Sequence, residues 1–218
     1  NASGTGRLSG NSFKVVLQKG EYAGWQVTEG LVDFPAFNPR GQKFRVFAKG
    51  RGPARNIVQV LADSRLEFDL DPARVSGDAE MTYELFRPAL SDVPYEDLRF
   101  TGFGTIRNTG LKGAAFGFDF TGGAVKVDLD QNGIVMSGQG KLGPSPVDFV
   151  WKDSFAEDGK PADLTAKGLV TADFLNGFGI LGRAYMTGEA PLDVRATLEG
   201  ADLETALVGI NFTDARLD

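Results

Sequence analysis

Apolar residues fall at every second position along most of this chain. Near the start, Phe13, Val15 and Leu17 follow this period. The side chains of a strand point alternately to opposite faces of a sheet, so the period is typical of strands with one buried face. The sequence therefore predicts an all-β protein. The same alternation recurs at residues 25–31, 44–48, 75–85, 98–107, 116–121 and 147–151.

The clearest hairpin is predicted over residues 124–142. Its two strands carry apolar residues at alternate positions, from Val125 to Leu129 and from Ile134 to Leu142. Between them, Asn132-Gly133 is expected to supply the positive φ angles of a tight turn. A meander of mainly antiparallel strands is the simplest topology for such hairpins.

Two segments have helical spacing instead. Over 53–65, Ile57, Val58 and Leu61 lie on one side of a predicted helix, and Pro53 suits its first turn. A second short helix is predicted over 171–181, with Thr171 as a capping residue. The fold expected from these patterns is an elongated, curved, mostly antiparallel sheet that forms a groove and carries two short helices.

Two nine-residue stretches resemble each other. Residues 75–83 read VSGDAEMTY and residues 186–194 read MTGEAPLDV, and each follows a predicted helix and begins a strand. A helix-then-strand unit that appears twice favours an elongated repeat architecture over a closed barrel. We therefore expect residues 1–218 to form one repeat segment, with modules at 1–110 and 111–218.

The amino-acid composition argues against several classes of function. The chain of 218 residues has 29 Gly and 17 Phe, a net charge of −6, and no Cys or His. An acidic protein repels phosphates, so nucleic-acid binding is disfavoured. The absence of Cys and His removes thiol nucleophiles, Cys/His zinc sites and His-based triads. We expect no enzyme activity, no cofactor and no metal.

The spacing of the carboxylates does not favour a metal-binding or catalytic site. Asp128, Asp130 and Asn132 are spaced like calcium ligands, but position 139 is Gln where the calcium loop needs a bidentate Glu. The other aspartates on strands are interpreted as a solvated face of an acidic protein.

Several Gly-containing segments, taken in order, resemble the AsmA-like superfamily, in particular its YhdP- and TamB-type members. The most specific is 70–79, LDPARVSGDA, which in similar proteins joins a helix to the next long strand. The remaining segments are 4–10 (GTGRLSG), 30–35 (GLVDFP), 47–54 (FAKGRGPA) and 168–190, which looks like the following module.

This resemblance implies a bridge-like lipid-transfer role. Such proteins are anchored in the inner membrane of Gram-negative bacteria, extend through the periplasm, and move phospholipid toward the outer membrane along an apolar β-groove. The family has no catalytic residues to carry over. The chain opens at Asn1 and contains no apolar run of the ~18 residues that span a bilayer. It is therefore interpreted as a piece of a longer protein whose membrane anchor lies outside it.

A groove for acyl chains needs a strand face that is apolar and open. Burial of apolar area, at roughly 25 cal/mol per Å², would drive binding. Gly102, Gly104, Gly138 and Gly140 are expected on the inward face, where glycine permits bending. The candidate lipid-binding residues share that face: Phe100, Ile106, Phe116, Phe118, Phe120, Val125, Val127, Leu129, Ile134, Met136, Leu142, Phe149 and Trp151.

Two alternatives stay open at this point. The same residues are also typical of the core of a β-sandwich or barrel, which would make the chain a structural or interaction scaffold of the bacterial envelope. A carbohydrate-active domain is a third interpretation. The primary expectation is a periplasmic, non-catalytic segment that binds phospholipid acyl chains and supports outer-membrane biogenesis.

Overall fold

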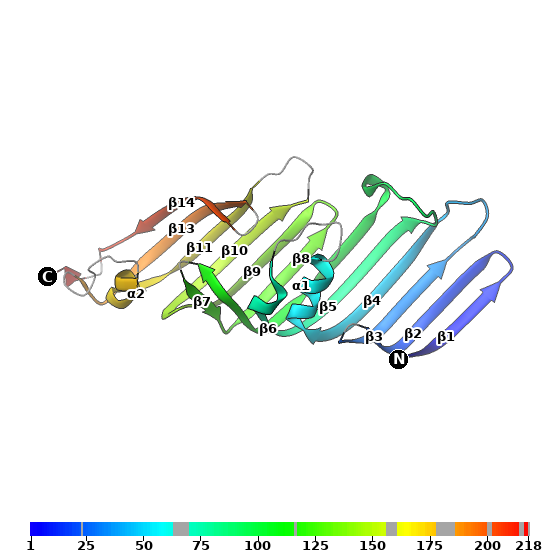
Figure 1. Cartoon of the computed structure of the whole chain (residues 1–218), viewed down its shortest axis with the longest axis horizontal. Coiled ribbons are helices and arrows are strands. Elements are labelled where there is room, and N and C mark those ends of the chain that lie inside the picture. The colour runs from blue at the N-terminus through cyan, green and yellow to red at the C-terminus, as the bar shows by residue number, and fades with distance from the viewer. Residues whose placement is uncertain are drawn as a thin grey trace.

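The computed structural model describes residues 1–22, 24–62, 70–115, 117–155, 161–177, 186–199, 202–213 and 216–217. Most of them belong to one 13-stranded antiparallel sheet, which confirms the all-β prediction. Figure 1 shows a long single layer of strands, with β1 near one end and β14 near the other.

The strands of this sheet are β1 (Ala2–Ser9), β2 (Ser12–Tyr22), β3 (Trp25–Phe34), β4 (Lys43–Pro53), β5 (Val75–Pro88), β6 (Arg99–Ala115), β7 (Phe118–Thr121), β8 (Ala124–Asp130), β9 (Gly133–Leu142), β10 (Ser145–Ser154), β11 (Ala162–Thr171), β13 (Glu189–Glu199) and β14 (Asp202–Ile210). A second, two-stranded sheet pairs β12 (Met186–Thr187) with β15 (Arg216–Leu217). The helices are α1 (Ala54–Ala62) and α2 (Ala172–Gly177), with 3₁₀ turns η1 (Pro72–Arg74) and η2 (Tyr95–Asp97).

Strands that follow each other in the chain are neighbours in the sheet almost throughout. The order is β1-β2-β3-β4-β5-β6-β7-β9-β10-β11-β13-β14. The long strand β6 pairs with β8 along one part and with β7 along another, and both of these shorter strands pair with β9. The module boundary suggested at residues 110 and 111 falls inside β6, in the continuous part of the sheet.

The hairpin of β8 and β9 lies where the sequence predicts it, but its turn differs. Asp130 pairs with Gly133, so the turn residues are Gln131 and Asn132, and neither Asn132 nor Gly133 has a positive φ. The Asp130 carboxylate instead accepts hydrogen bonds from the backbone N–H and the Nδ2 group of Asn132, at 2.7 and 3.2 Å. The prediction of an Asn-Gly turn is therefore wrong, because an aspartate that bonds to the backbone two residues later supplies an alternative turn.

Both helices occur, with limits that differ from the prediction. α1 begins at Ala54, because Pro53 still pairs with Asp78 as the last residue of β4. Predicted residues 63–65 of this helix lie outside the described residues. In α2, the backbone N–H of Phe174 donates to Oγ1 of Thr171, as expected for a capping residue. Residues 178–181 also lie outside the described part.

The two repeated stretches share local structure. Each follows a strand–helix connection, β4–α1 or β11–α2, and each contains a glycine with positive φ, 129° at Gly77 and 91° at Gly188. Two residues after the glycine, each stretch has a buried alanine, Ala79 or Ala190. This alanine belongs to the same cluster of buried apolar residues as the helix that precedes it. A small side chain at this place lets the helix approach the sheet closely.

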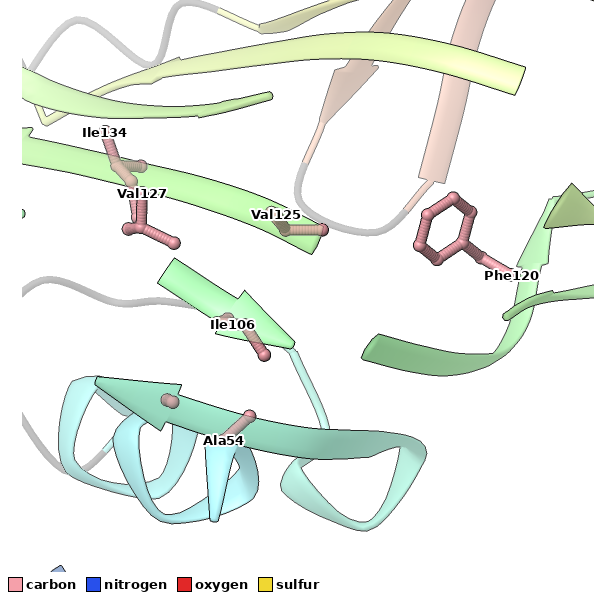
Figure 2. Close-up of a cluster of buried hydrophobic side chains, with 7 residues drawn as sticks. Ala54, Ile106, Phe120, Val125, Val127 and Ile134 are labelled. Atoms are coloured by element: carbon pink, nitrogen blue, oxygen red, sulfur yellow. The ribbon is translucent and has the colours of Figure 1, made fainter. Parts of the chain in front are cut away.

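Two clusters of buried apolar residues form the core. The larger joins Ala54 of α1 to strands β5, β6, β7, β8 and β9; Figure 2 shows its residues Ala54, Ile106, Phe120, Val125, Val127 and Ile134. The smaller joins Phe174 and Leu175 of α2 to Val170, Ala190 and Leu192 of the sheet. Both clusters lie on the same face of the sheet.

Candidate functional site

The register of the sheet separates an apolar face from a polar face. Residues directly opposite each other on antiparallel strands point to the same side, so a chain of partners across the sheet traces one face. The row that contains Val127 and Met136 crosses twelve strands from edge to edge without a polar or charged side chain. It runs Ala2–Gly20–Val27–Gly50–Met81–Gly104–Val127–Met136–Trp151–Leu164–Ala196–Ala206. We call this the apolar row.

The apolar row is long. Neighbouring strands lie about 4.8 Å apart, so twelve strands span roughly 50 Å across the sheet. Met81, Met136, Trp151 and Leu164 are only partly buried. Within the described residues no second sheet lies over them, since the other sheet is the short pair of β12 and β15.

The next row along the strands points to the opposite side and is mostly polar, with Val150 and Leu207 as apolar members. It includes Arg51, Glu80, Thr105, Lys126 and Arg195. Cross-strand ion pairs lie on this face, and because they are exposed they contribute little to stability. The pairs are Lys14–Asp33, Arg45–Glu84, Lys49–Glu80 and Lys167–Asp193.

Glycines on the apolar face make room for large neighbours. A Cβ at Gly102 would lie 2.9 Å from Leu129, and one at Gly138 would lie 3.0 Å from Val125. The ring of Phe120 occupies the corresponding space at Gly140. Large side chains therefore lie over glycines of the adjacent strand, and a single layer buries apolar area without a second sheet. The predicted inward position of these glycines is confirmed.

The helices and β7 line one long side of the apolar face. They pack where β4, β6, β9 and β11 end, with Ala54 of α1 against Ala79 and Phe174 of α2 against Val170. Between them, Phe118 of β7 stacks on Phe174 with ring centroids 5.2 Å apart. Figure 1 shows α1 and α2 on the near side of the sheet. The apolar face thus has a wall along one side.

The opposite side of the face is rich in aromatic rings. Phe34 stacks on Phe44 with centroids 4.3 Å apart and contacts Phe13 and Phe37. Farther along, Phe100 contacts Tyr83 and Tyr95. Burial raises the pKa of both tyrosines, and each is raised further by a charge interaction, with Tyr95 for Tyr83 and with Asp130 for Tyr95.

Two charged residues of the described main-sheet strands share the apolar face, both near its aromatic side. Arg87 lies opposite Phe44, stacks over its ring, and donates from Nη2 to the carbonyl of Leu90 at 2.8 Å. Asp153 lies opposite Ile134. Burial raises the pKa of Asp153, and a hydrogen bond from the backbone of Ser154 opposes this shift.

The structure gathers the candidate lipid-binding residues on the apolar face, over β6 to β10, with different degrees of burial. Phe118 stacks on Phe174 of α2 and is therefore part of the wall along one side of the face. Phe116 lies outside the described residues. Buried are Phe100, Ile106, Phe120, Val125, Val127 and Ile134. Half-buried are Phe118, Leu129, Met136, Leu142, Phe149 and Trp151.

The face extends well beyond the predicted set. Val15 and Leu17 of β2, Val46 of β4, and Leu164 and Val194 near the other end lie on it as well. The alternation in their strands was the signal that could have found them. Their place beside β6 to β10 depends on strand order, which the alternation does not give.

Other kinds of site find little support. Among the described residues, no group of three or more His, Cys, Asp or Glu side chains is arranged to hold a metal ion. None of the described helices has the length and apolar character needed to cross a membrane. Two shallow hollows, of about 620 and 530 Å³, are lined largely by polar-face residues such as Thr165 and Arg195, and Lys14 and Glu29.

Comparison with protein-family models, with curated proteins and with solved structures gives no match for this chain. Any function proposed for it therefore depends on the two faces of the sheet.

Proposed function

We propose that this chain binds phospholipid acyl chains on its apolar face and holds or conducts them between membranes. In this proposal it is a non-catalytic, periplasmic segment of an AsmA-like protein anchored in the inner membrane of a Gram-negative bacterium. The single observation that carries the proposal is the apolar row, which crosses twelve strands of the sheet without a polar side chain.

Three features support this use of the face. Acyl chains have no directional chemistry, so an unbroken apolar strip meets their one requirement, the removal of apolar area from water. Side chains such as Met136 and Trp151 keep part of their surface exposed. Methionine adapts its shape easily, which suits a ligand without fixed geometry.

The two tryptophans of the chain allow a direct test. Trp151 is in the apolar row, and Trp25 packs over Gly50 and Gly52 beside the α1 cluster. In the Trp25→Phe variant, emission comes from Trp151 alone. Vesicles of phosphatidylethanolamine and phosphatidylglycerol with brominated acyl chains should quench it, whereas the same lipids without bromine should not. The matched control moves the reporter to the polar face, as Val150→Trp in a chain with both native tryptophans changed to Phe. Its emission should stay unquenched.

A pair of substitutions on β9 tests the same surface. Met136→Asp puts a charge into the apolar row, and Val135→Asp puts it on the opposite face of the same strand, where Val135 is 38% exposed. Native mass spectrometry should detect co-purified phospholipid with the wild type and Val135→Asp, and lose it with Met136→Asp. Wild-type protein that carries no phospholipid and shows no bromine quenching would contradict the proposal.

A structural scaffold is the second candidate, and the burial of six candidate residues favours it. Val127 and Ile134 are 5% and 2% exposed, as expected for core residues. If Met136→Asp unfolds the chain, as seen by circular dichroism, and the wild type carries no lipid, the apolar face serves as core and the scaffold is the better interpretation.

A further inference from the structure

The apolar face changes in character along the direction of its strands. On the side of the helices it ends in buried apolar side chains such as Ala79 and Val170. On the opposite side it ends in aromatic rings, and the two charged residues of this face that the described main-sheet strands carry, Arg87 and Asp153, lie there. A phospholipid has the same two kinds of end, because its acyl chains gain from burial and its phosphate binds hydrogen-bond donors.

Arg87 is a cation whose charge is not balanced by a carboxylate. On the polar face, the ion pairs described above each join a cation to a carboxylate of the neighbouring strand. Arg87 instead lies opposite Phe44 and stacks over its ring, with the guanidinium carbon 5.9 Å from the centroid. Within the described residues, no carboxylate forms an ion pair with it. An anionic ligand would supply the missing charge.

The hydrogen bonds of Arg87 fix its guanidinium and leave donors over. Nε donates to the carbonyl of Pro88 at 3.4 Å, and Nη2 donates to the carbonyl of Leu90 at 2.8 Å. In the part of the chain that the structure describes, Nη1 has no acceptor. A planar guanidinium that is held in place and keeps unused N–H groups suits a phosphate, which accepts several hydrogen bonds at once.

The distance from Arg87 to the apolar row fits an acyl chain. Leu85, Tyr83 and Met81 precede Arg87 at every second position of β5, so all of them point to the apolar face. Met81 belongs to the apolar row and lies six positions before Arg87, which is about 20 Å along a strand. An acyl chain in one leaflet occupies about 15 Å, half of the hydrocarbon core of a bilayer.

The side chains along this path keep apolar surface exposed. Leu85 and Met81 are partly buried, and Tyr83 is 37% exposed. A lipid with its phosphate at Arg87 would therefore place its tail on surface that the protein itself leaves open.

We propose that Arg87 binds the phosphate of a phospholipid whose acyl chains lie along β5 toward the wall formed by α1. This inference rests on the proposed binding of acyl chains and adds the orientation of the lipid, with the headgroup on the aromatic side of the face and the tails toward the helices. Burial of the tails supplies most of the affinity, and Arg87 adds a preference for lipids that carry a phosphate.

Phosphatidic acid and diacylglycerol with the same acyl chains differ only by the phosphate, so they isolate the contribution of Arg87. Native mass spectrometry of wild-type protein, incubated in detergent with equal amounts of both lipids, should show at least about tenfold more bound phosphatidic acid, as expected for a hydrogen bond to a charged group. Arg87→Gln should bind both lipids equally. Its binding of diacylglycerol should match the wild type, which also shows that the variant is folded.

Arg99 offers a matched control on the other face of the sheet. It lies opposite Phe86 on the next strand, β6, and, like Arg87, it donates to backbone carbonyls, those of Glu96 and Leu98. Arg99→Gln should keep the wild-type preference for phosphatidic acid. Arg87→Lys, which retains the positive charge, should prefer phosphatidic acid more than Arg87→Gln does.

Hydrogen exchange of the wild type tests the same contact without a variant. Peptides that contain Arg87 should exchange more slowly with phosphatidic acid than with diacylglycerol, whereas peptides of β13 should exchange alike with both. Titration calorimetry with inorganic phosphate alone should show no saturable binding, because one partly exposed arginine gains little from a small ion in water.

The outcomes separate this inference from the proposed function. Equal binding of both lipids by the wild type, a preference that survives in Arg87→Gln, or equal exchange near Arg87 with both lipids would overturn the inference and leave acyl-chain binding in place. Saturable binding of inorganic phosphate that Arg87→Gln abolishes would overturn it too, because the site would then belong to free phosphate. If the wild type binds neither lipid, both proposals fail.

Discussion

Single glycines decide which large side chains can cover the apolar face. Gly104 lies in the apolar row between Met81 and Val127, and an added Cβ would collide with the carbonyl of Glu80 and the Sδ of Met81. Gly104→Ala should therefore lower the free energy of unfolding by about 1–3 kcal/mol, the usual cost of overpacking. Urea denaturation measures this. Gly209→Ala is the control, because its nearest neighbour would lie 3.9 Å away; equal losses in both variants would contradict the explanation.

Asp153 is a partly buried aspartate on the apolar face, and burial disfavours its charged form. Burial raises its pKa in the folded chain, so the stability that it contributes is complete below the unfolded-state pKa and is lost as pH rises through the folded-state pKa. Asp153→Asn should therefore raise the urea midpoint relative to the wild type, and by more at pH 7 than at pH 4. Asp148→Asn, an exposed change on the polar face of the same strand, should alter the midpoint little. A gain that is the same at both pH values would exclude the ionisation as its cause.

At the scale of elements, the short helices depend on the sheet beneath them. α1 has nine residues, too few to be stable alone in water, so packing holds it in place. Val58 is 8% exposed against the sheet, and Val60 is 48% exposed on the same helix. Val58→Ala should reduce the free energy of unfolding by about 2 kcal/mol through lost burial, and Val60→Ala should change it by less than about 0.5 kcal/mol. Thermal and urea unfolding followed by circular dichroism give both values. Similar losses in the two variants would show that α1 does not depend on this contact.

At the scale of the whole molecule, nearly every strand touches only its neighbours in sequence. Such a nearly one-dimensional arrangement is stabilised by neighbour contacts, and its ends open more easily than its centre. Native-state hydrogen exchange should therefore be slowest in β5, β6, β8 and β9, which surround the larger cluster, and fastest in β1 and β14. Mass spectrometry of peptides resolves these regions. Uniform protection from β1 to β14 would show that the sheet unfolds as one cooperative unit.

The sequence by itself determined which residues share a face, because the period of two is a local property of a strand. It also placed both helices, the inward glycines such as Gly138, and the β8–β9 hairpin. Tertiary structure alone decided that strands in chain order align their apolar positions into one row, from Ala2 to Ala206, and that Phe118 turns to the α2 wall. These outcomes depend on which strands become neighbours and on what covers them. Both are set by contacts between distant residues, on which local periodicity carries no information.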